Sequence, residues 1–224
     1  MPNLPKYVNP RTDSAWHVQT ALWRAPDDGG YVNLSDGEGL SRDAIDSSKN
    51  SLWRYREAIR LPDEKIVSLG EGWTPIVSSD WAGREVIFKM EYMMPSGSYK
   101  DRGSAVMMNY LRQVGVDSIL EDSSGNAGSS IATYGAFLNV KSKIFVPADA
   151  PLAKRQQIAA VGADIVAVEG SRDDVAAAAV KEAEKLFYAC HNLQPYFLEG
   201  TKTLAFEIWE QLNYKLPDAI VIPM

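Results

Sequence analysis

The stretch Lys89-Met-Glu-Tyr-Met-Met-Pro-Ser-Gly-Ser-Tyr-Lys100-Asp-Arg-Gly103 runs from an apolar strand, predicted over 85–90, through a Pro/Gly/Ser loop into a helix predicted over 101–113. Lys100 lies where the loop meets the helix. The unpaired N–H groups of a helix N-terminus carry partial positive charge, which favours the neutral, nucleophilic form of a lysine. Position alone favours an ordinary solvated lysine in a first helical turn, because most lysines are solvated charges.

A second stretch, Glu121-Asp-Ser-Ser-Gly-Asn126-Ala-Gly-Ser-Ser130, follows a strand predicted over 118–121 and opens an uncharged helix. Small residues let a ligand come close to the backbone, and a helix N-terminus offers N–H donors to an anion. The loop therefore suits a carboxylate or phosphate group. An ordinary strand-to-helix turn with a Ser or Asn cap would have a similar composition.

Together and in this order, the two motifs resemble threonine synthase and its relatives, which are pyridoxal-phosphate enzymes of the tryptophan-synthase-β type (fold type II). The resemblance rests on Pro95-Ser-Gly-Ser-Tyr-Lys-Asp-Arg-Gly103 and on Ser123-Ser-Gly-Asn-Ala-Gly128. Glu71-Gly-Trp-Thr-Pro75 matches the family's Glu-Gly-x-Thr-Pro segment, and the stretch 198–208 resembles its downstream helix. The similarity covers roughly residues 52–224.

The resemblance implies an α/β fold with doubly wound, mostly parallel sheets in two domains. Residues 1–94 would form an N-terminal extension and the first part of the large domain, 95–198 the small α/β domain, and 199–224 the return to the large domain. The residue pattern agrees, because short apolar strands alternate with helices from residue 85 onward. Ligands of such sheets lie beyond the C-terminal strand ends, so the loops of the two motifs are expected to converge there.

The pattern also predicts the individual elements. Helices are expected over 52–59, 101–113, 126–138, 151–161, 172–188 and 201–212, and strands over 85–90, 118–121, 143–146, 164–168, 196–197 and 218–224. The region 25–51 is predicted to be a long connection. In the family the last strand leads to a glycine-rich loop for the cofactor phosphate. The resemblance therefore implies that the chain is either a fragment or a natural truncation of the catalytic fold.

The resemblance assigns roles to residues of both motifs. Lys100 would be the catalytic lysine that binds pyridoxal 5'-phosphate covalently and afterwards moves protons, and Asn126 would hydrogen-bond the cofactor's 3' oxygen. The substrate carboxylate and its surroundings would be contacted by Ser123, Ser124, Gly125, Ala127 and Thr74. Glu71 and Arg102 are expected to have structural roles. Tyr99 stands where the family more often has Phe.

The implied reaction is that of threonine synthase, a lyase that converts O-phospho-L-homoserine and water into L-threonine and phosphate. Other enzymes of the family share the lysine and asparagine motifs, so serine/threonine or diaminopropionate ammonia-lyases and β-replacement enzymes remain alternatives. A third reading is a non-catalytic binding or assembly protein that keeps part of the fold. The resemblance implies a homodimer acting on a small amino acid.

Composition excludes several other classes. The net charge of −6 and the lack of a basic run argue against nucleic acid as a partner. Cys190 is the single cysteine, which excludes an internal disulfide, and the two histidines, His17 and His191, lack metal-ligand spacing, so no metal site is expected. Cys190-His191 could form a nucleophile and its base, although adjacent side chains rarely face each other. No signal peptide or membrane span is expected, which indicates a soluble cytoplasmic protein.

Overall fold

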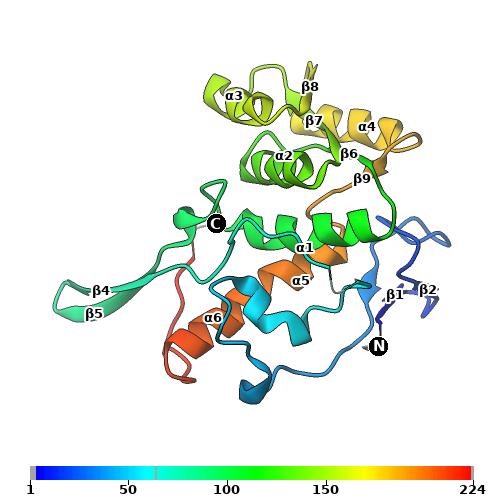
Figure 1. Ribbon diagram of the computed structural model, residues 1–224. Helices are drawn as coiled ribbons and strands as arrows, with labels where there is room; N and C mark the ends of the chain where they lie inside the picture. The colour runs from blue at the N-terminus through cyan, green and yellow to red at the C-terminus, as the bar shows by residue number, and fades with distance from the viewer. Residues whose placement is uncertain (1–3, 64, 223–224) are drawn as a thin grey trace.

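The computed structural model describes residues 4–63 and 65–222. Figure 1 shows a parallel sheet with its helices at one end of the molecule, a long central helix beneath it, and the N-terminal strands and an extended hairpin on either side. The elements relevant to the site follow from residue 76 as β4 (Ile76–Trp81), β5 (Arg84–Lys89), η3 (Glu91–Met93), α1 (Lys100–Gln113), β6 (Ser118–Glu121), α2 (Asn126–Leu138), β7 (Lys141–Pro147), α3 (Leu152–Ala160), β8 (Asp164–Val168), α4 (Arg172–Glu182), β9 (Phe187–Tyr188), α5 (Pro195–Thr201) and α6 (Thr203–Gln211).

Within the described residues, the main sheet has the strand order β8-β7-β6-β9, and every neighbouring pair is parallel. Alternate side chains of β7 point to opposite faces, as in any strand. Ile144 packs with Ile158 of α3 on one face, while Phe145 packs with Val175 and Ala179 of α4 on the other. Because helices cover both faces, the strands contain runs of consecutive apolar residues, such as 144–146 in β7.

The N-terminal part forms smaller elements along the central helix. These are β1 (Lys6–Val8), β2 (Ala15–His17), β3 (Asn33–Leu34), and the 3-10 helices η1 (Arg42–Ala44) and η2 (Leu52–Ala58). β1 pairs with β2 and β3 in an antiparallel sheet, and β4 pairs with β5 as a separate hairpin. Tyr7 of β1 is fully buried, and its hydroxyl donates a 2.7 Å hydrogen bond to the hydroxyl of Tyr110 in α1.

Helix α1 runs through the centre of the molecule, and its residues 101–111 are all buried. It lies close to α5 because glycines occupy the contact. A Cβ on Gly103 would come within 2.5 Å of the Phe197 ring, and a Cβ on Gly200 within 2.0 Å of the Arg102 carbonyl oxygen. Tyr110 and Tyr196 stack with ring centroids 3.8 Å apart. Lys100, which begins α1, therefore belongs to a helix that packs closely against α5.

The α/β fold with a parallel sheet is confirmed, and the strands predicted over 118–121, 143–146 and 164–168 lie in one sheet. The helices predicted over 101–113 and 126–138 are present as α1 and α2. The proposed division into domains at 94/95 and 198/199 stays a prediction.

Several element predictions are wrong in their type or extent. The segment predicted as a helix over 52–59 is the 3-10 helix η2, and the strand predicted over 85–90 pairs antiparallel with β4 instead of joining the parallel sheet. The helix predicted over 172–188 ends at Glu182, because Phe187 and Tyr188 pair with Ile119 and Leu120 as strand β9. The strand predicted over 196–197 belongs to α5, where proline at the first helical position and a Gln194 cap start a helix. Residues 218–222 form no strand, since they pair with no neighbouring strand, and residues 223–224 lie outside the described part.

No helix among the described residues combines the length and apolar character needed to cross a membrane.

Candidate active site

Lys100 is the first residue of α1 and is half-buried. Its Nζ donates a 2.8 Å hydrogen bond to the hydroxyl oxygen of Tyr99. The same Nζ lies 4.7 Å from the centroid of the Tyr99 ring and 5.9 Å from that of Phe197. The amine is therefore held against two aromatic rings and keeps access to solvent. Tyr99 supplies the hydroxyl that the amine contacts.

Asn126 is the first residue of α2, and its side chain is exposed. Its Oδ1 accepts a 2.7 Å hydrogen bond from Lys154 Nζ of α3. This contact leaves the amide N–H groups of Asn126 free to donate elsewhere. The preceding loop turns tightly onto the helix, because a Cβ on Gly128 would lie 1.8 Å from the Ser123 carbonyl oxygen. Only glycine can occupy that position in this conformation.

The N-termini of α1 and α2 are tied together by Asp101. Its buried carboxylate accepts hydrogen bonds from the Ser130 hydroxyl of α2 and from both the backbone N–H and the hydroxyl of Ser96. Burial raises the pKa of Asp101, and the hydrogen bonds from Ser130 and Ser96 oppose that shift. Ser96 also accepts a 3.1 Å hydrogen bond from Gln157 of α3 through its carbonyl oxygen. The segment around Lys100 is thus tied to α2 through Asp101 and to α3 through Ser96.

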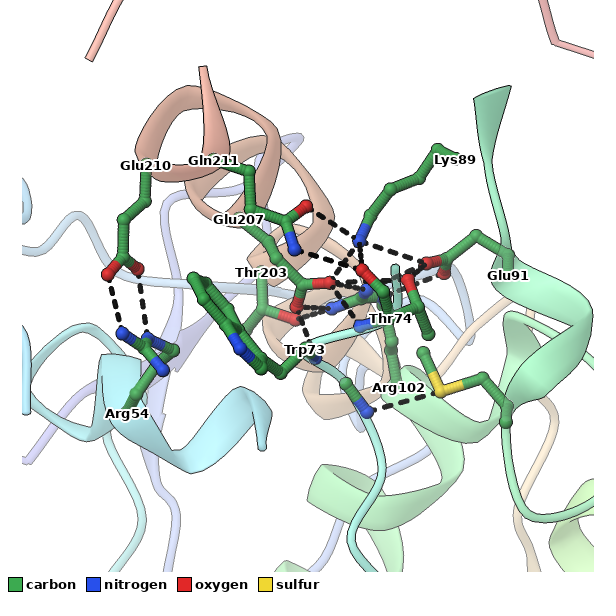
Figure 2. A network of polar contacts seen from close by, with 12 residues as sticks. Arg54, Trp73, Thr74, Lys89, Glu91, Arg102, Thr203, Glu207, Glu210 and Gln211 are labelled. Carbon is green, nitrogen blue, oxygen red and sulfur yellow. Dashed lines mark hydrogen bonds and ion pairs between the residues drawn. The ribbon is translucent and has the colours of Figure 1, made fainter. Parts of the chain in front are cut away.

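A buried ion cluster surrounds Arg102 (Figure 2). Arg102, next to the catalytic candidate, donates two 2.8 Å hydrogen bonds to Glu207 of α6 and two more of 2.8 Å to Glu91 of η3. Lys89 of β5 also contacts Glu207, as Figure 2 shows. Thr74 is 3% exposed, and its hydroxyl donates a 2.6 Å hydrogen bond to Glu91. The cluster joins α1, α6, the hairpin and the Glu-Gly-Trp-Thr-Pro segment.

The charges in this cluster stabilise one another. Burial alone would raise the pKa of Glu207, but the hydrogen bonds and charges of Arg102 and Lys89 outweigh it and lower the pKa to about 2. Burial lowers the pKa of Lys89, and Glu207 opposes that shift. Glu207 is therefore ionised throughout the physiological range. The cluster therefore fastens the start of α1 to α6 and η3 inside the protein.

Glu71 makes a second set of internal contacts. Its fully buried carboxylate accepts hydrogen bonds from Trp53 Nε1 at 2.5 Å, from the Leu69 backbone N–H at 2.7 Å and from the Tyr134 hydroxyl at 3.0 Å. These donors come from η2, from the neighbouring loop and from α2. Glu71 and Arg102 both make internal structural contacts in the structure, in line with the expectation from sequence.

The predicted site residues divide into two groups. Lys100, Asn126 and the loop of Ser123, Ser124, Gly125 and Ala127 lie at the ends of α1 and α2, where a ligand would meet an amine, an amide and helix N–H donors. Thr74 instead lies in the ion cluster, with its hydroxyl bound to Glu91 and Glu207. The catalytic and binding roles of all these residues stay predictions.

Sequence reasoning missed several partners. Glu207 and Glu91 carry no local signal, because a carboxylate in a predicted helix or turn is usually solvated. Lys154 likewise resembles a surface lysine, yet it binds Asn126. The nucleophile–base pair considered for Cys190-His191 is not formed. His191 Nδ1 lies 2.6 Å from Glu121 Oε1, and burial raises the pKa of the Cys190 thiol to about 11.

The residues at the N-termini of α1 and α2 suit pyridoxal phosphate. The cofactor's aldehyde requires an accessible amine, which Lys100 provides beside aromatic rings. Its ring oxygen requires a hydrogen-bond partner, and Asn126 has free amide donors at a helix N-terminus. The donor set therefore fits the group that the two motifs imply.

Comparison with known proteins agrees with this geometry. The model of the family described as "Pyridoxal-phosphate dependent enzyme" matches residues 67–224. The threonine synthase of Methanocaldococcus jannaschii is 36% identical over 203 residues, which cover 87% of this chain and 49% of that protein. The chain spans about half the length of the curated relatives it matches.

Solved structures of other enzymes share the fold of this chain. A pyridoxal 5'-phosphate-dependent aspartate racemase superposes with a TM-score of 0.58 at 26% identity, covering 62% of this chain and 46% of the racemase. The processed form of threonine deaminase isoform 2 from Solanum lycopersicum gives a TM-score of 0.51 at 29% identity, covering 56% of this chain and 35% of the deaminase.

Proposed function

The chain belongs to the pyridoxal-phosphate dependent enzyme family, and we propose that it takes part in converting O-phospho-L-homoserine and water into L-threonine and phosphate. The observation that carries this proposal is the position of Lys100 and Asn126 at the N-termini of two packed helices, tied together through Asp101 and Ser130. The threonine synthases that match most of the chain support the choice of substrate.

Lys100 would hold the cofactor and then act on the substrate. Bound pyridoxal phosphate supplies an electron sink for the substrate's α-carbon. Lys100 Nζ would hold the cofactor through its aldehyde and, once free, would take and return protons at the substrate carbons. The Tyr99 hydroxyl, 2.8 Å from Nζ, would orient the free amine between these steps.

Asn126 and its loop would orient the ligands. Lys154 holds Oδ1 of Asn126, so Nδ2 would donate to the cofactor's 3' oxygen. The backbone N–H groups and hydroxyls of the loop from Ser123 to Ala127 would bind the substrate carboxylate, since a helix N-terminus stabilises an anion. We also propose a substrate contact for Thr74, which would require its hydroxyl to leave Glu91.

An ammonia-lyase activity is the second candidate. The similarity to a threonine deaminase structure favours it, because that enzyme shares the fold at 29% identity. Serine, threonine and diaminopropionate are the substrates to test, together with β-replacement reactions. The same lysine and asparagine would serve these reactions, so only turnover separates them.

The deciding experiment maps the reactive lysine. The protein is incubated with pyridoxal phosphate, reduced with borohydride and digested for mass spectrometry. We expect label at Lys100 in clear excess over every other lysine, and its loss in Lys100→Ala but not in Lys185→Ala, because Lys185 is 74% exposed and remote in sequence from the motif. Turnover of phosphohomoserine is then compared with turnover of serine, threonine and diaminopropionate.

Other results would change the conclusion. Scattered labelling with no turnover of any of these amino acids would favour the non-catalytic binding or assembly role. Ammonia release from serine or threonine without phosphate release from phosphohomoserine would favour the ammonia-lyase. We also propose a cytoplasmic homodimer, which light scattering on the purified protein would test through its mass.

A further inference from the structure

Three buried side chains that the reaction does not use meet at the carboxyl end of the sheet. Glu121 ends β6, Asp122 follows it, and Cys190 lies just after the adjacent parallel strand β9. One ligand atom from each lies within 4.8 Å of the others. The three residues are 0%, 3% and 5% exposed, respectively. The group therefore brings two carboxylates and a thiol together away from bulk water.

Each carboxylate has one oxygen that a basic side chain holds, and the buried Tyr188 hydroxyl also interacts with Asp122 and Cys190. Glu121 Oε1 lies 2.6 Å from His191 Nδ1, and Asp122 Oδ2 lies 2.7 Å from Arg172 Nη2. Within the described part of the chain, Glu121 Oε2 and Asp122 Oδ1 have no hydrogen-bond partner. A buried carboxylate oxygen without a partner is costly and calls for an occupant.

We propose that Glu121, Asp122 and Cys190 bind one divalent metal ion of the zinc class. Calcium and magnesium prefer sites made of oxygen alone, whereas zinc and cobalt accept carboxylate and thiolate ligands together. His191 and Arg172 would fix the orientation of the two carboxylates by holding their other oxygens, as hydrogen-bond partners of metal ligands commonly do.

Protons compete with a metal ion for the side chains of this cluster. Burial raises the pKa of Glu121 and raises that of the Cys190 thiol to about 11, so without a metal ion the thiol would keep its proton at neutral pH. A metal ion would replace the thiol proton, since the thiolate is the ligand. Cys190 is the single cysteine of the chain, so a disulfide within the chain cannot occupy its sulfur.

The position gives the ion a structural role. Asp122 directly precedes the loop from Ser123 to Ala127, and Cys190 directly precedes His191 in the connection to α5. Between them, the Ala189 N–H donates a 2.8 Å hydrogen bond to the Leu120 carbonyl oxygen. A bound ion would clamp β6 to the β9–α5 connection and so hold the base of the loop. It would take no part in the proposed reaction.

The test uses Co²⁺ as a spectroscopic probe on the purified protein after removal of metals. We expect one equivalent of Co²⁺ to bind with a near-ultraviolet sulfur-to-cobalt charge-transfer band, and Zn²⁺ to displace it. At about a hundredfold excess over Kd, Zn²⁺ should raise the Tm by roughly 5 °C or more. Absence of the band in the wild-type protein would by itself overturn the proposal and leave protons as the occupant.

Variants identify the ligands. Cys190→Ser should abolish the charge-transfer band, and Asp122→Asn should weaken Co²⁺ binding at least about tenfold. Glu199→Gln is the matched control, because Glu199 Oε2 is also buried without a partner but belongs to no such group among the described residues. Binding that survives both ligand substitutions would contradict the site. Lys100 labelling is read separately, so failure here would not affect the proposed function.

Discussion

The guanidinium of Arg102 and the carboxylate of Glu207 form a paired ion bridge through Nη1 and Nη2, each 2.8 Å from an oxygen, and both side chains are 0% exposed. The bridge links α1, just after the catalytic candidate, to α6, about a hundred residues further along the chain. Because both charges are buried, each depends on the other.

Replacing Arg102 by Met should destabilise the protein strongly. The substitution removes the guanidinium that pairs with both Glu207 and Glu91, and leaves Lys89 as the remaining cation beside Glu207 among the described residues. Removal of one member of a buried ion pair costs about 3–5 kcal/mol. Denaturant unfolding measures this loss in the free energy of unfolding. Arg11→Met is the control, since Arg11 and Asp28 form a similar paired bridge on the surface. A loss as large in the control would refute the argument from burial.

Glu207 should also make stability depend on pH. Its pKa is lowered to about 2 from an ordinary value of 4.5, so its contribution is present above pH 4.5 and is lost as the pH falls toward 2. The contribution amounts to about 3 kcal/mol. Wild type and Glu207→Gln should therefore differ most at pH 6 and converge between pH 5 and 2. A difference that stays constant over this range would count against the assignment.

Gly128 and Gly125 lie in one loop but should respond differently to alanine. A Cβ at Gly128 would lie 1.8 Å from the Ser123 carbonyl oxygen, whereas a Cβ at Gly125 would have its nearest neighbour at 3.8 Å. Gly128→Ala should lower the free energy of unfolding by about 3 kcal/mol or more because backbone must move. Gly125→Ala should cost less than about 1 kcal/mol. Equal effects in thermal unfolding would show that the loop rearranges freely.

Lys154 should affect cofactor binding through Asn126. Lys154→Met removes the donor that holds Asn126 Oδ1 at 2.7 Å and lets the amide rotate. Loss of one hydrogen bond should weaken pyridoxal phosphate binding about two- to tenfold in an absorbance titration. Lys185→Met provides the comparison, because Lys185 pairs with Glu182 inside its own segment. Unchanged affinity in Lys154→Met would mean that Asn126 is oriented by other contacts.

Local patterns predicted most of the sheet but little of the interior polar contacts. The strands over 118–121 and 164–168 were predictable because short apolar runs follow turns. Lys100 and Asn126 were singled out through the family resemblance of their motifs, and their roles stay predictions. Phe187–Tyr188 was read as helix, since only pairing with β6 makes it a strand. Glu207 was not predictable as a buried anion, because its partners lie 105 and 118 residues away along the chain.

The hydrogen bond from Tyr7 to Tyr110 joins the N-terminal segment to the central helix α1. The family model begins at residue 67, yet Tyr7 lies in the same core as α1, and Tyr110 donates a 2.8 Å hydrogen bond to the Val18 carbonyl oxygen. The start of the family match at residue 67 is therefore not the edge of the packed core in this protein. A product expressed from residue 67 would expose the apolar side of the lysine-bearing helix and should aggregate rather than behave as an autonomous domain.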